Sequence, residues 1–392
     1  MAAVAESIAL IGDLIAFSTV STESNKELLG FVDAYLARHG VRSEIIWNAE
    51  ASKGNLWATI GPTDRPGVIL SGHSDVVPVE DQAWSSNPFI MRQADGRLYG
   101  RGTCDMKGFL GIVLAFVPEL CRRDLKVPVH IAISYDEELG CTGVLSLVDR
   151  IAALAVKPAL CIVGEPTSMQ LVVGHKSGTC HLVTVRGTAA HSSLAPQAVN
   201  AIGYAAELIS FIHGIDGELK ESGDQDPLYE VPHSTLSVTT ISGGTAFNII
   251  PERCTFGVDM RALASLDVAA VIRRIECFAR ERLLPRMHAV APEASITVSE
   301  VVAYAGLDVD VAHPAVAFMK HLLGRNDHSK VAYGTEAGAF SARGRVVSVV
   351  CGPGSIAQAH KADEFLAISE IEKCHRFFRR LIDRLAADDL PW

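Results

Sequence analysis

The chain has 392 residues, of which 48% are hydrophobic and 20% charged, and such a chain can bury a sizeable core. Its net charge is −10 and it contains no lysine or arginine run, so we expect no nucleic-acid partner and no binding to an anionic membrane surface. No apolar run reaches about 18 residues, and we therefore predict no transmembrane helix.

The cysteines and the N-terminal residues bear on the compartment. Nine cysteines are scattered singly with no C-x-x-C pair, which argues against a disulfide framework and against a cysteine zinc site. Residues 1–20 are apolar but interrupted by Glu6 and Asp13, and they lack the basic segment and the cleavage site of a signal peptide. We predict a cytoplasmic protein.

The first half of the chain alternates between helical and strand-like patterns. Residues 3–17 and 25–39 have the periodicity of amphipathic helices, and Gly40 stands where a C-cap glycine is expected. Beyond them, β-rich runs at 55–61, 67–71, 127–135 and 158–163 alternate with helical stretches at 108–121 and 144–154. This alternation predicts an α/β domain with helices on both faces of its sheet.

The pattern changes near residue 177 and returns near residue 303. Strands are expected at 179–186, 234–241, 253–259 and 294–300, with helices at 200–212 and 266–284 and a polar loop at 218–227. That βαββαβ order is the ferredoxin-like split motif. A buried strand at 346–350 and an amphipathic helix at 368–385 follow. We therefore predict an α/β domain of residues 1–177 and 303–392, interrupted by an α+β insertion of residues 178–302.

Five polar segments directly follow apolar runs, and each carries a candidate metal ligand: His73, Asp105, Glu138, Glu165 and His360. The first four are separated by 32, 33 and 27 residues, about one strand–helix unit each. Because ligands bind at the carboxyl ends of strands in open α/β sheets, these side chains are expected to meet at one edge. Imidazole and carboxylate donors together suit zinc, and also manganese or cobalt.

Each of these residues also has an ordinary structural explanation. A single His or Asp after a strand commonly caps a turn, and the adjacent Glu137 and Glu138 could begin a solvated helix. Five such coincidences at strand ends favour a metal site instead. Two metals that share a carboxylate can hold both a nucleophile and a carbonyl oxygen.

The polar segments resemble a known family, the di-zinc hydrolases that include aminoacylase, acetylornithine deacetylase and glutamate carboxypeptidase. The matching segments extend over nearly the whole chain: Ser71–Pro78, Tyr99–Gly108, Asp136–Glu138, Gly164–Thr167, Ala190–Ser193, Asn248–Pro251 and Gly352–Phe365. The last of these, together with Gly334–Ala337, is most similar to acetylornithine deacetylase. The resemblance implies a zinc-exopeptidase-like catalytic domain and an inserted lid that also serves dimerisation.

The resemblance also implies roles for the candidate ligands. It implies two Zn²⁺ per subunit, with Co²⁺ or Mn²⁺ as alternatives: one held by His73 and Glu165, one by Glu138 and His360, and both bridged by Asp105. Asp75 is expected to take the other ring N–H of His73 and so set its tautomer. Glu137 is expected to be the general base that activates the water.

Further residues are assigned to the substrate by the same resemblance. His191 is expected to donate to the developing oxyanion from the other subunit of a homodimer, and Arg261 to hold a substrate carboxylate. Asn248, Gly334 and Thr335 match other substrate contacts. Glu336 is expected either to meet a cationic substrate side chain or to lie at a helix N-terminus.

Two residues stay without an assigned role. Lys176 lies near a basic position of the family. Cys104 precedes Asp105, but no His/Asn constellation accompanies it, and a cysteine mechanism is not expected.

The expected activity is a metal-dependent amidohydrolase that removes the acyl group from N-acyl amino acids. The leading expectation is conversion of N2-acetyl-L-ornithine to L-ornithine and acetate, a step of arginine biosynthesis. Other candidates are an enzyme acting on acetylcitrulline, acyl-diaminobutyrate or succinyl-diaminopimelate, and a metallo-dipeptidase or carboxypeptidase. A binding module on a catalytically dead scaffold would have lost ligands or Glu137, and this sequence has lost none.

Overall fold

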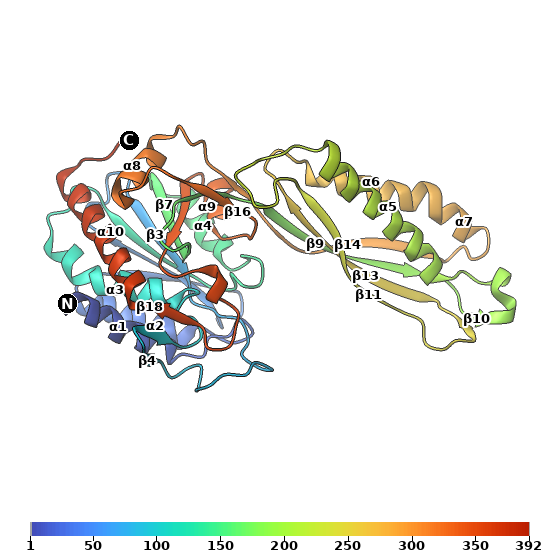
Figure 1. The fold of residues 1–392 in the computed structure, drawn as a ribbon, viewed down its shortest axis with the longest axis horizontal. Helices are drawn as coiled ribbons and strands as arrows, with labels where there is room; N and C mark the ends of the chain where they lie inside the picture. Colours follow the sequence, from blue (N-terminus) through green and yellow to red (C-terminus); the bar gives the residue numbers. More distant parts are fainter. Residues whose placement is uncertain (1, 392) are drawn as a thin grey trace. The chain divides into compact units, whose positions relative to one another are not determined.

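The computed structural model describes residues 2–391, and the chain divides into two compact units. The first unit contains the residues up to His175 together with those from Leu307 onward, and the second runs from Lys176 to Gly306. The boundaries expected from the sequence, 178 and 302, lie two and four residues inside this second unit. The two units are described in turn (Figure 1).

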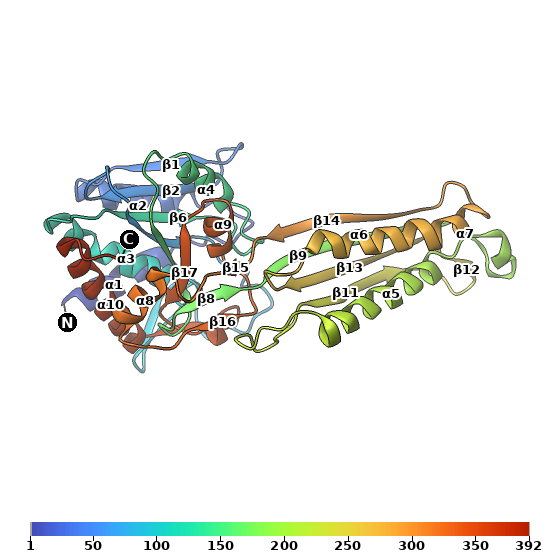
Figure 2. The ribbon, with the colours of Figure 1, turned by 90° about the horizontal axis from the view of Figure 1, so that it is seen from above.

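The first unit is built on a nine-stranded mixed sheet (Figures 1 and 2). Its strand order is β1-β2-β6-β3-β7-β17-β8-β15, and β16 also pairs with β8. The strands are β1 (Ser43–Trp47), β2 (Gly54–Ile60), β3 (Val68–His73), β6 (Val129–Ser134), β7 (Leu160–Pro166), β8 (Val172–His175), β15 (Leu307–Asp308), β16 (Ser329–Val331) and β17 (Val347–Gly352).

Helices cover both faces of this sheet, as the sequence predicts. They are α1 (Ala2–Ile15), α2 (Lys26–Arg38), α3 (Lys107–Arg122), α4 (Val144–Ala152), α8 (Pro314–Leu323), α9 (Ala337–Ala342) and α10 (Ile368–Ala387). Neighbouring residues of one strand point to opposite faces. On β3, Ser71 donates a hydrogen bond to Glu336 at the start of α9. A side chain at the next position, Gly72, would instead meet Met106 and Leu110 at the start of α3.

The central strands β3, β6 and β7 are buried at every position. They run parallel to one another, with β3 between the other two. Strands covered on both faces are apolar throughout, which is why they read as continuous hydrophobic runs in the sequence. Their carboxyl ends meet at one edge, and the polar residues that follow them are brought together there.

A small three-stranded sheet lies in the same unit, in the order β18-β5-β4. Its strands are β4 (Arg92–Ala94), β5 (Arg97–Tyr99) and β18 (Phe365–Ala367), and the short helix η3 (Ile356–Gln358) precedes β18. In the antiparallel pairing of β18 with β5, Phe365 stands opposite Tyr99. This sheet therefore joins the loop after residue 99 to the loop before residue 365.

The second unit contains a four-stranded antiparallel sheet in the order β11-β13-β9-β14 (Figure 2). Its elements are β9 (Ser177–Arg186), β10 (Ala190–His191), η1 (Ser192–Gln197), α5 (Ala201–Ser222), β11 (Thr235–Gly243), β12 (Ile249–Ile250), β13 (Arg253–Ala262), α6 (Val268–Phe278), η2 (Ala279–Leu283), α7 (Leu284–His288) and β14 (Ser295–Tyr304). The long elements follow the βαββαβ order.

One expected loop of the second unit is partly helical. The sequence predicts a loop over residues 218–227, but α5 continues to Ser222. Ile215 and Leu219 remain buried against the sheet at helical spacing, and this packing overrides the polar composition around them.

The structure also bears on disulfide bonds and on membrane-spanning helices. All nine cysteines are free thiols. Within residues 2–391, none of the helices has the length and apolar character needed to cross a membrane.

Candidate metal centre

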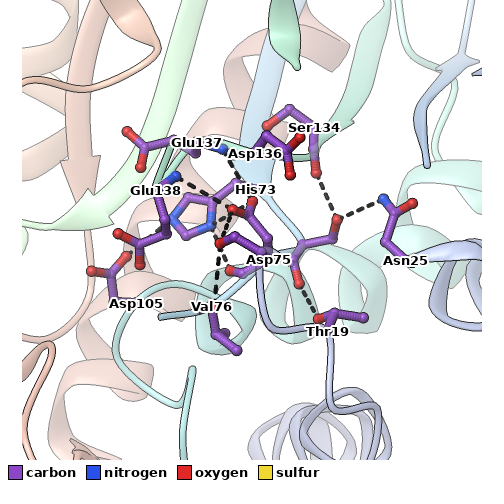
Figure 3. A network of polar contacts seen from close by, with 12 residues as sticks. Thr19, Asn25, His73, Asp75, Val76, Asp105, Ser134, Asp136, Glu137 and Glu138 are labelled. Atoms are coloured by element: carbon purple, nitrogen blue, oxygen red, sulfur yellow. Dashed lines mark hydrogen bonds and ion pairs between the residues drawn. The ribbon is translucent and has the colours of Figure 1, made fainter. Parts of the chain in front are cut away.

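The five candidate ligands all belong to the first unit and meet at the carboxyl edge of its sheet. Figure 3 shows three of them, His73, Asp105 and Glu138. His73 ends β3, Glu165 lies in β7, and Glu138 follows β6. Asp105 precedes α3 and His360 follows η3. Loops rather than strands deliver these last two side chains.

The distances within the cluster give Asp105 a central position. Its Oδ1 is 3.0 Å from Nε2 of His73, and its Oδ2 is 3.3 Å from Nε2 of His360. The His73 nitrogen is also 3.6 Å from Oε1 of Glu165, and the His360 nitrogen is 3.1 Å from Glu138. The two imidazoles therefore face different oxygens of one carboxylate, with one further carboxylate beside each of them.

The donor set fits bound cations. Oε1 of Glu165 is buried and has no hydrogen-bond partner among the described residues. Two groups of three side chains, each with donor atoms within 4.8 Å of one another, could hold an ion: His73 with Glu137 and Glu165, and His73 with Asp105 and Glu138. Nitrogen and oxygen donors of this kind suit divalent zinc, cobalt or manganese.

The electrostatics of the cluster also favour a bound cation. Burial, followed by the negative charges of neighbouring carboxylates, raises the pKa values of Glu137, Glu138 and Glu165 above their usual range. Burial opposes the positive charge on His73, yet its hydrogen bonds to Asp105 and Asp75 raise its pKa well above the usual value. Hydrogen bonds to Asp105 and Glu138 raise the pKa of His360 to about 10. Carboxylates crowded in a buried place repel one another when ionised, and a bound cation relieves that repulsion.

Asp75 connects His73 to the Glu137–Glu138 pair. Nδ1 of His73 is 2.8 Å from the backbone oxygen of Asp75 and 3.5 Å from its Oδ1, so the nearest acceptor is the carbonyl rather than the expected carboxylate. The carboxylate accepts the Ser21 hydroxyl at 2.7 Å and the backbone N–H groups of Glu137 and Glu138 at 3.2 and 3.3 Å (Figure 3). Asp75 thus holds the segment that carries both glutamates.

Replacing Asp75 tests this connection. Asp75→Ala removes the acceptor for two backbone N–H groups and should weaken metal binding by about 10–100-fold, as is typical for groups that orient ligands. Competition with a chromophoric chelator measures the affinity. Asp64→Ala, at an exposed position of the loop between β2 and β3, is the control and should leave the metal affinity unchanged. Equal affinities for the two variants would contradict the role.

Glu336 has an interior position. Its exposed fraction is 0%. Its two carboxylate oxygens accept hydrogen bonds from Ser71 at 2.6 Å and from Ser134 at 2.5 Å. Of the two roles expected from the sequence, contact with a substrate cation is therefore excluded because no oxygen reaches the surface. The helix-terminal position is correct, since Glu336 is the N-cap residue of α9.

The role of Glu336 is accordingly one of stability. Glu336→Ala leaves two buried serine hydroxyls without their acceptor, and each such loss costs about 1–3 kcal/mol. The unfolding free energy, measured in urea, should fall by that order. The matched control Glu44→Ala removes an exposed carboxylate that pairs with Arg150 and should change it by about 1 kcal/mol or less.

The first unit also contains three other residues considered from the sequence: Gly334, Thr335 and Cys104. Thr335 is buried, and its hydroxyl accepts the N–H of Ala337 at the start of α9, whereas Gly334 is partly exposed. Cys104 is buried, its thiol faces the Ser355 carbonyl, and burial raises its pKa far above the usual value. Because the thiolate is the reactive form, a nucleophilic role for Cys104 is not supported.

The remaining expected site residues lie in the second unit. His191 is exposed, its Nδ1 is 2.8 Å from the Ser193 hydroxyl, and the pairing of β10 with β12 brings it beside Asn248.

Arg261 and Lys176 are engaged within the second unit. The Arg261 guanidinium binds the Asp259 carboxylate at 3.0 Å and contacts the Tyr304 hydroxyl. Lys176 donates to the His233 carbonyl, and burial lowers its pKa.

Sequence reasoning missed several supporting residues. Ser21 binds the Asp75 carboxylate, and Ser134 binds Glu336. Tyr333 is partly buried near the cluster; burial, then the charges of Glu165 and Asp105, raise the pKa of its phenol. Ser134 and Tyr333 each lie within a few residues of a motif residue, and that proximity was the only available signal.

Curated relatives have the same name as the protein that the motifs most resemble. Acetylornithine deacetylase from Proteus mirabilis (strain HI4320) is 31% identical over 384 residues, covering 96% of this chain and 96% of the relative. Acetylornithine deacetylase from Photorhabdus laumondii is also 31% identical, over 385 residues and the same shares of both chains.

Solved structures share the fold. A family M20 metallo-carboxypeptidase from Sulfolobus solfataricus matches with a TM-score of 0.76 at 18% identity, covering 97% of this chain and 99% of that one. A dinuclear metal-binding peptidase of family M20 from Bacillus subtilis matches with a TM-score of 0.68 at 16% identity, covering 99% of each chain. At such identities the likeness establishes the architecture.

A family match covers most of the chain and includes the whole candidate metal centre. The match is to the family described as peptidase family M20/M25/M40 and extends over residues 69–384. That range contains all five candidate ligands, Glu137 and Asp75. The chain therefore belongs to peptidase family M20/M25/M40 and is a hydrolase that acts on amide bonds.

Proposed function

We propose that the protein is a two-metal deacylase of N-acyl amino acids, with N2-acetyl-L-ornithine as the leading substrate and L-ornithine and acetate as products. The observation that carries the proposal is the placement of Glu137, a carboxylate with a raised pKa next to the candidate ligands. The relatives named acetylornithine deacetylase support the choice of substrate. With that substrate, the enzyme serves arginine biosynthesis.

The candidate ligands divide between two ions. His73 and Glu165 would hold one, Glu138 and His360 would hold the other, and Asp105 would be shared between them. When bound, Zn²⁺ or Co²⁺ supplies Lewis-acid activation of the water and of the amide carbonyl. Glu137 accepts the proton of the attacking water and returns it to the nitrogen of the leaving amino acid. A group with a raised pKa is suited to both transfers at neutral pH.

Residues of the second unit complete the proposal. His191 donates to the oxyanion from the partner subunit of a homodimer, and Arg261 binds the substrate carboxylate. Asn248 of the same unit, and the backbone of Gly334 and Thr335 in the first unit, make further substrate contacts. The inserted unit then acts as lid and dimerisation domain. Nine free thiols support a cytoplasmic location.

Other acyl substrates and peptides are the competing candidates. Acetylcitrulline, acyl-diaminobutyrate and succinyl-diaminopimelate differ from acetylornithine in the acyl group or in the amino-acid side chain. All of them contain an amide bond on which the same two-metal chemistry can act. A metallo-dipeptidase or carboxypeptidase has the support of peptidase structures that share the fold. A catalytically dead binding module has none, because every candidate ligand and Glu137 are present.

One experiment separates these candidates. Free amine is measured after incubation of the zinc-loaded protein with acetyl-, formyl- and succinyl-amino acids and with dipeptides, and bound metal is analysed in the same sample. We expect the highest kcat/KM for N2-acetyl-L-ornithine. A higher value for a dipeptide would replace the deacylase proposal with a peptidase, and metal-loaded protein without any turnover would favour a binding module.

A further inference from the structure

Glu364 lies in the loop that carries the candidate ligand His360, four residues further along the chain. Its carboxylate side chain is only 1% exposed. The next residue begins β18, and the antiparallel pairing of β18 with β5 places Glu364 opposite the loop that follows Tyr99. The Gly100 N–H accordingly donates to the Glu364 backbone oxygen at 3.0 Å. The pairing of two short strands thus fixes where the carboxylate lies.

The Glu364 carboxylate holds the loop that carries Asp105. Its Oε1 accepts the backbone N–H groups of Cys104 at 2.8 Å and of Asp105 at 3.0 Å. Its Oε2 accepts the N–H of Gly102 at 3.1 Å and the Arg101 guanidinium at 2.7 Å. Each of the two carboxylate oxygens therefore accepts two hydrogen bonds, and Arg101 supplies the opposite charge. A buried carboxylate needs such partners to offset its loss of hydration.

Arg101 extends this network to further loops. Its guanidinium donates to the Gln82 side chain at 2.6 Å and approaches the carbonyl oxygens of Pro78 and Lys361 at 3.4 Å. Lys361 directly follows His360. The Glu364–Arg101 pair therefore joins the loop of Asp105 to the loop of His360.

His360 needs such an anchor more than the other ligands do. Its side chain is 51% exposed, whereas those of His73, Asp105, Glu138 and Glu165 are at most 9% exposed. It has a positive φ of 61°, and no regular element spans residues 359–364. Packing alone therefore does not hold this imidazole in place.

We propose that Glu364 is a positioning residue that sets the distance between Asp105 and His360. It thereby controls loading of the ion held by Asp105, Glu138 and His360. This inference rests on the two-metal function proposed above. The other ion shares Asp105 but depends also on His73 and Glu165, which are carried by β3 and β7. It is affected less because only one of its three ligands comes from a loop that Glu364 holds.

Glu364→Gln tests the proposal, because its amide NH₂ brings donors toward backbone N–H groups. The full-length protein is freed of metal and titrated with Co²⁺ against a competing chelator, while the visible spectrum of bound Co²⁺ is recorded. We expect the wild type to bind two ions. In the variant, one ion should bind within about twofold of wild type and the other about 10–100-fold more weakly, a size typical of groups that orient ligands.

Two further variants make the test specific. Glu370→Gln is the matched control, since Glu370 also accepts a backbone N–H, that of Gly354, but holds neither residues 101–105 nor residues 359–364. It should leave both affinities unchanged. Arg101→Gln keeps the three backbone hydrogen bonds to the Glu364 carboxylate. It should lower the affinity for the same ion, but less than Glu364→Gln does. This second variant decides the question if Glu364→Gln does not fold.

The outcomes are distinguishable. Two ions bound as tightly as in the wild type, or both weakened equally, would overturn the role of Glu364. A wild-type protein that binds no ion would overturn the two-metal function itself. Saturating Co²⁺ should restore kcat in Glu364→Gln, which a general loss of folding would not allow.

Discussion

Glu137→Gln should lose about 10²–10⁴-fold in kcat while still binding two metal ions, because the substitution removes a proton acceptor and keeps the shape of the side chain. That loss corresponds to about 3–5 kcal/mol of transition-state stabilisation. The raised pKa of Glu137 and its place beside the candidate ligands are the reasons to expect so large an effect. Initial rates on N2-acetyl-L-ornithine and metal analysis of the same preparation provide the measurement.

A matched control separates this effect from a change in folding. Glu44→Gln alters an exposed glutamate that pairs with Arg150, and its kcat should equal that of the wild type. A Glu137→Gln enzyme that retained most of its turnover would rule out Glu137 as the base. If it lost activity together with its metal, Glu137 would belong to the ligands instead.

Removal of metal is expected to have the second large effect. Chelation should abolish amide hydrolysis, and Zn²⁺ or Co²⁺ should restore it. At free ion about 1,000 times above Kd, each site stabilises the folded protein by about 4.1 kcal/mol. For a unit of this size, Tm should fall by roughly 10 °C when one such ion is lost. Differential scanning fluorimetry with and without chelator measures the shift, and normal turnover by metal-free protein would contradict the mechanism.

The dependence of metal binding on pH provides a sign to check. In the metal-free protein, hydrogen bonds to Asp105 and Glu138 raise the pKa of His360 to about 10, above its unfolded value of 6.5. The stability gained from the protonated ring is therefore complete below about pH 6.5 and disappears as pH rises through 10. A metal must displace that proton, so affinity should increase with pH over this range and loading should release protons. An affinity independent of pH would contradict this assignment.

The local sequence determined the chemistry of the site to a large extent. His73 and Glu165 were found because buried parallel strands appear as continuous apolar runs and because polar residues at their ends are conspicuous. Glu137 and Glu138 follow β6 in the same way. Period and composition are properties of the chain itself, so the sheet, its helices and the candidate ligands can be predicted from it.

Tertiary structure alone decided which polar residues lie inside and what they bind. Glu336 has the same local appearance whether it meets a substrate or two serines, and only the packing of α9 against β7 and β17 places it next to Ser71 and Ser134. The Asp75 carboxylate holds backbone N–H groups 62 and 63 residues away. Glu364 holds the loop of Asp105 from 259 residues away.

The end of α5 shows the same limit for secondary structure. Its last turn has a polar composition, and burial of Leu219 against the sheet keeps it helical. The arrangement of loops around His73, Asp105 and His360 likewise depends on hydrogen bonds between distant segments. The candidate ligands at the carboxyl edge of the sheet were therefore readable from the sequence. The residues that hold them in place were not, because their partners are chosen by packing and not by neighbours in the chain.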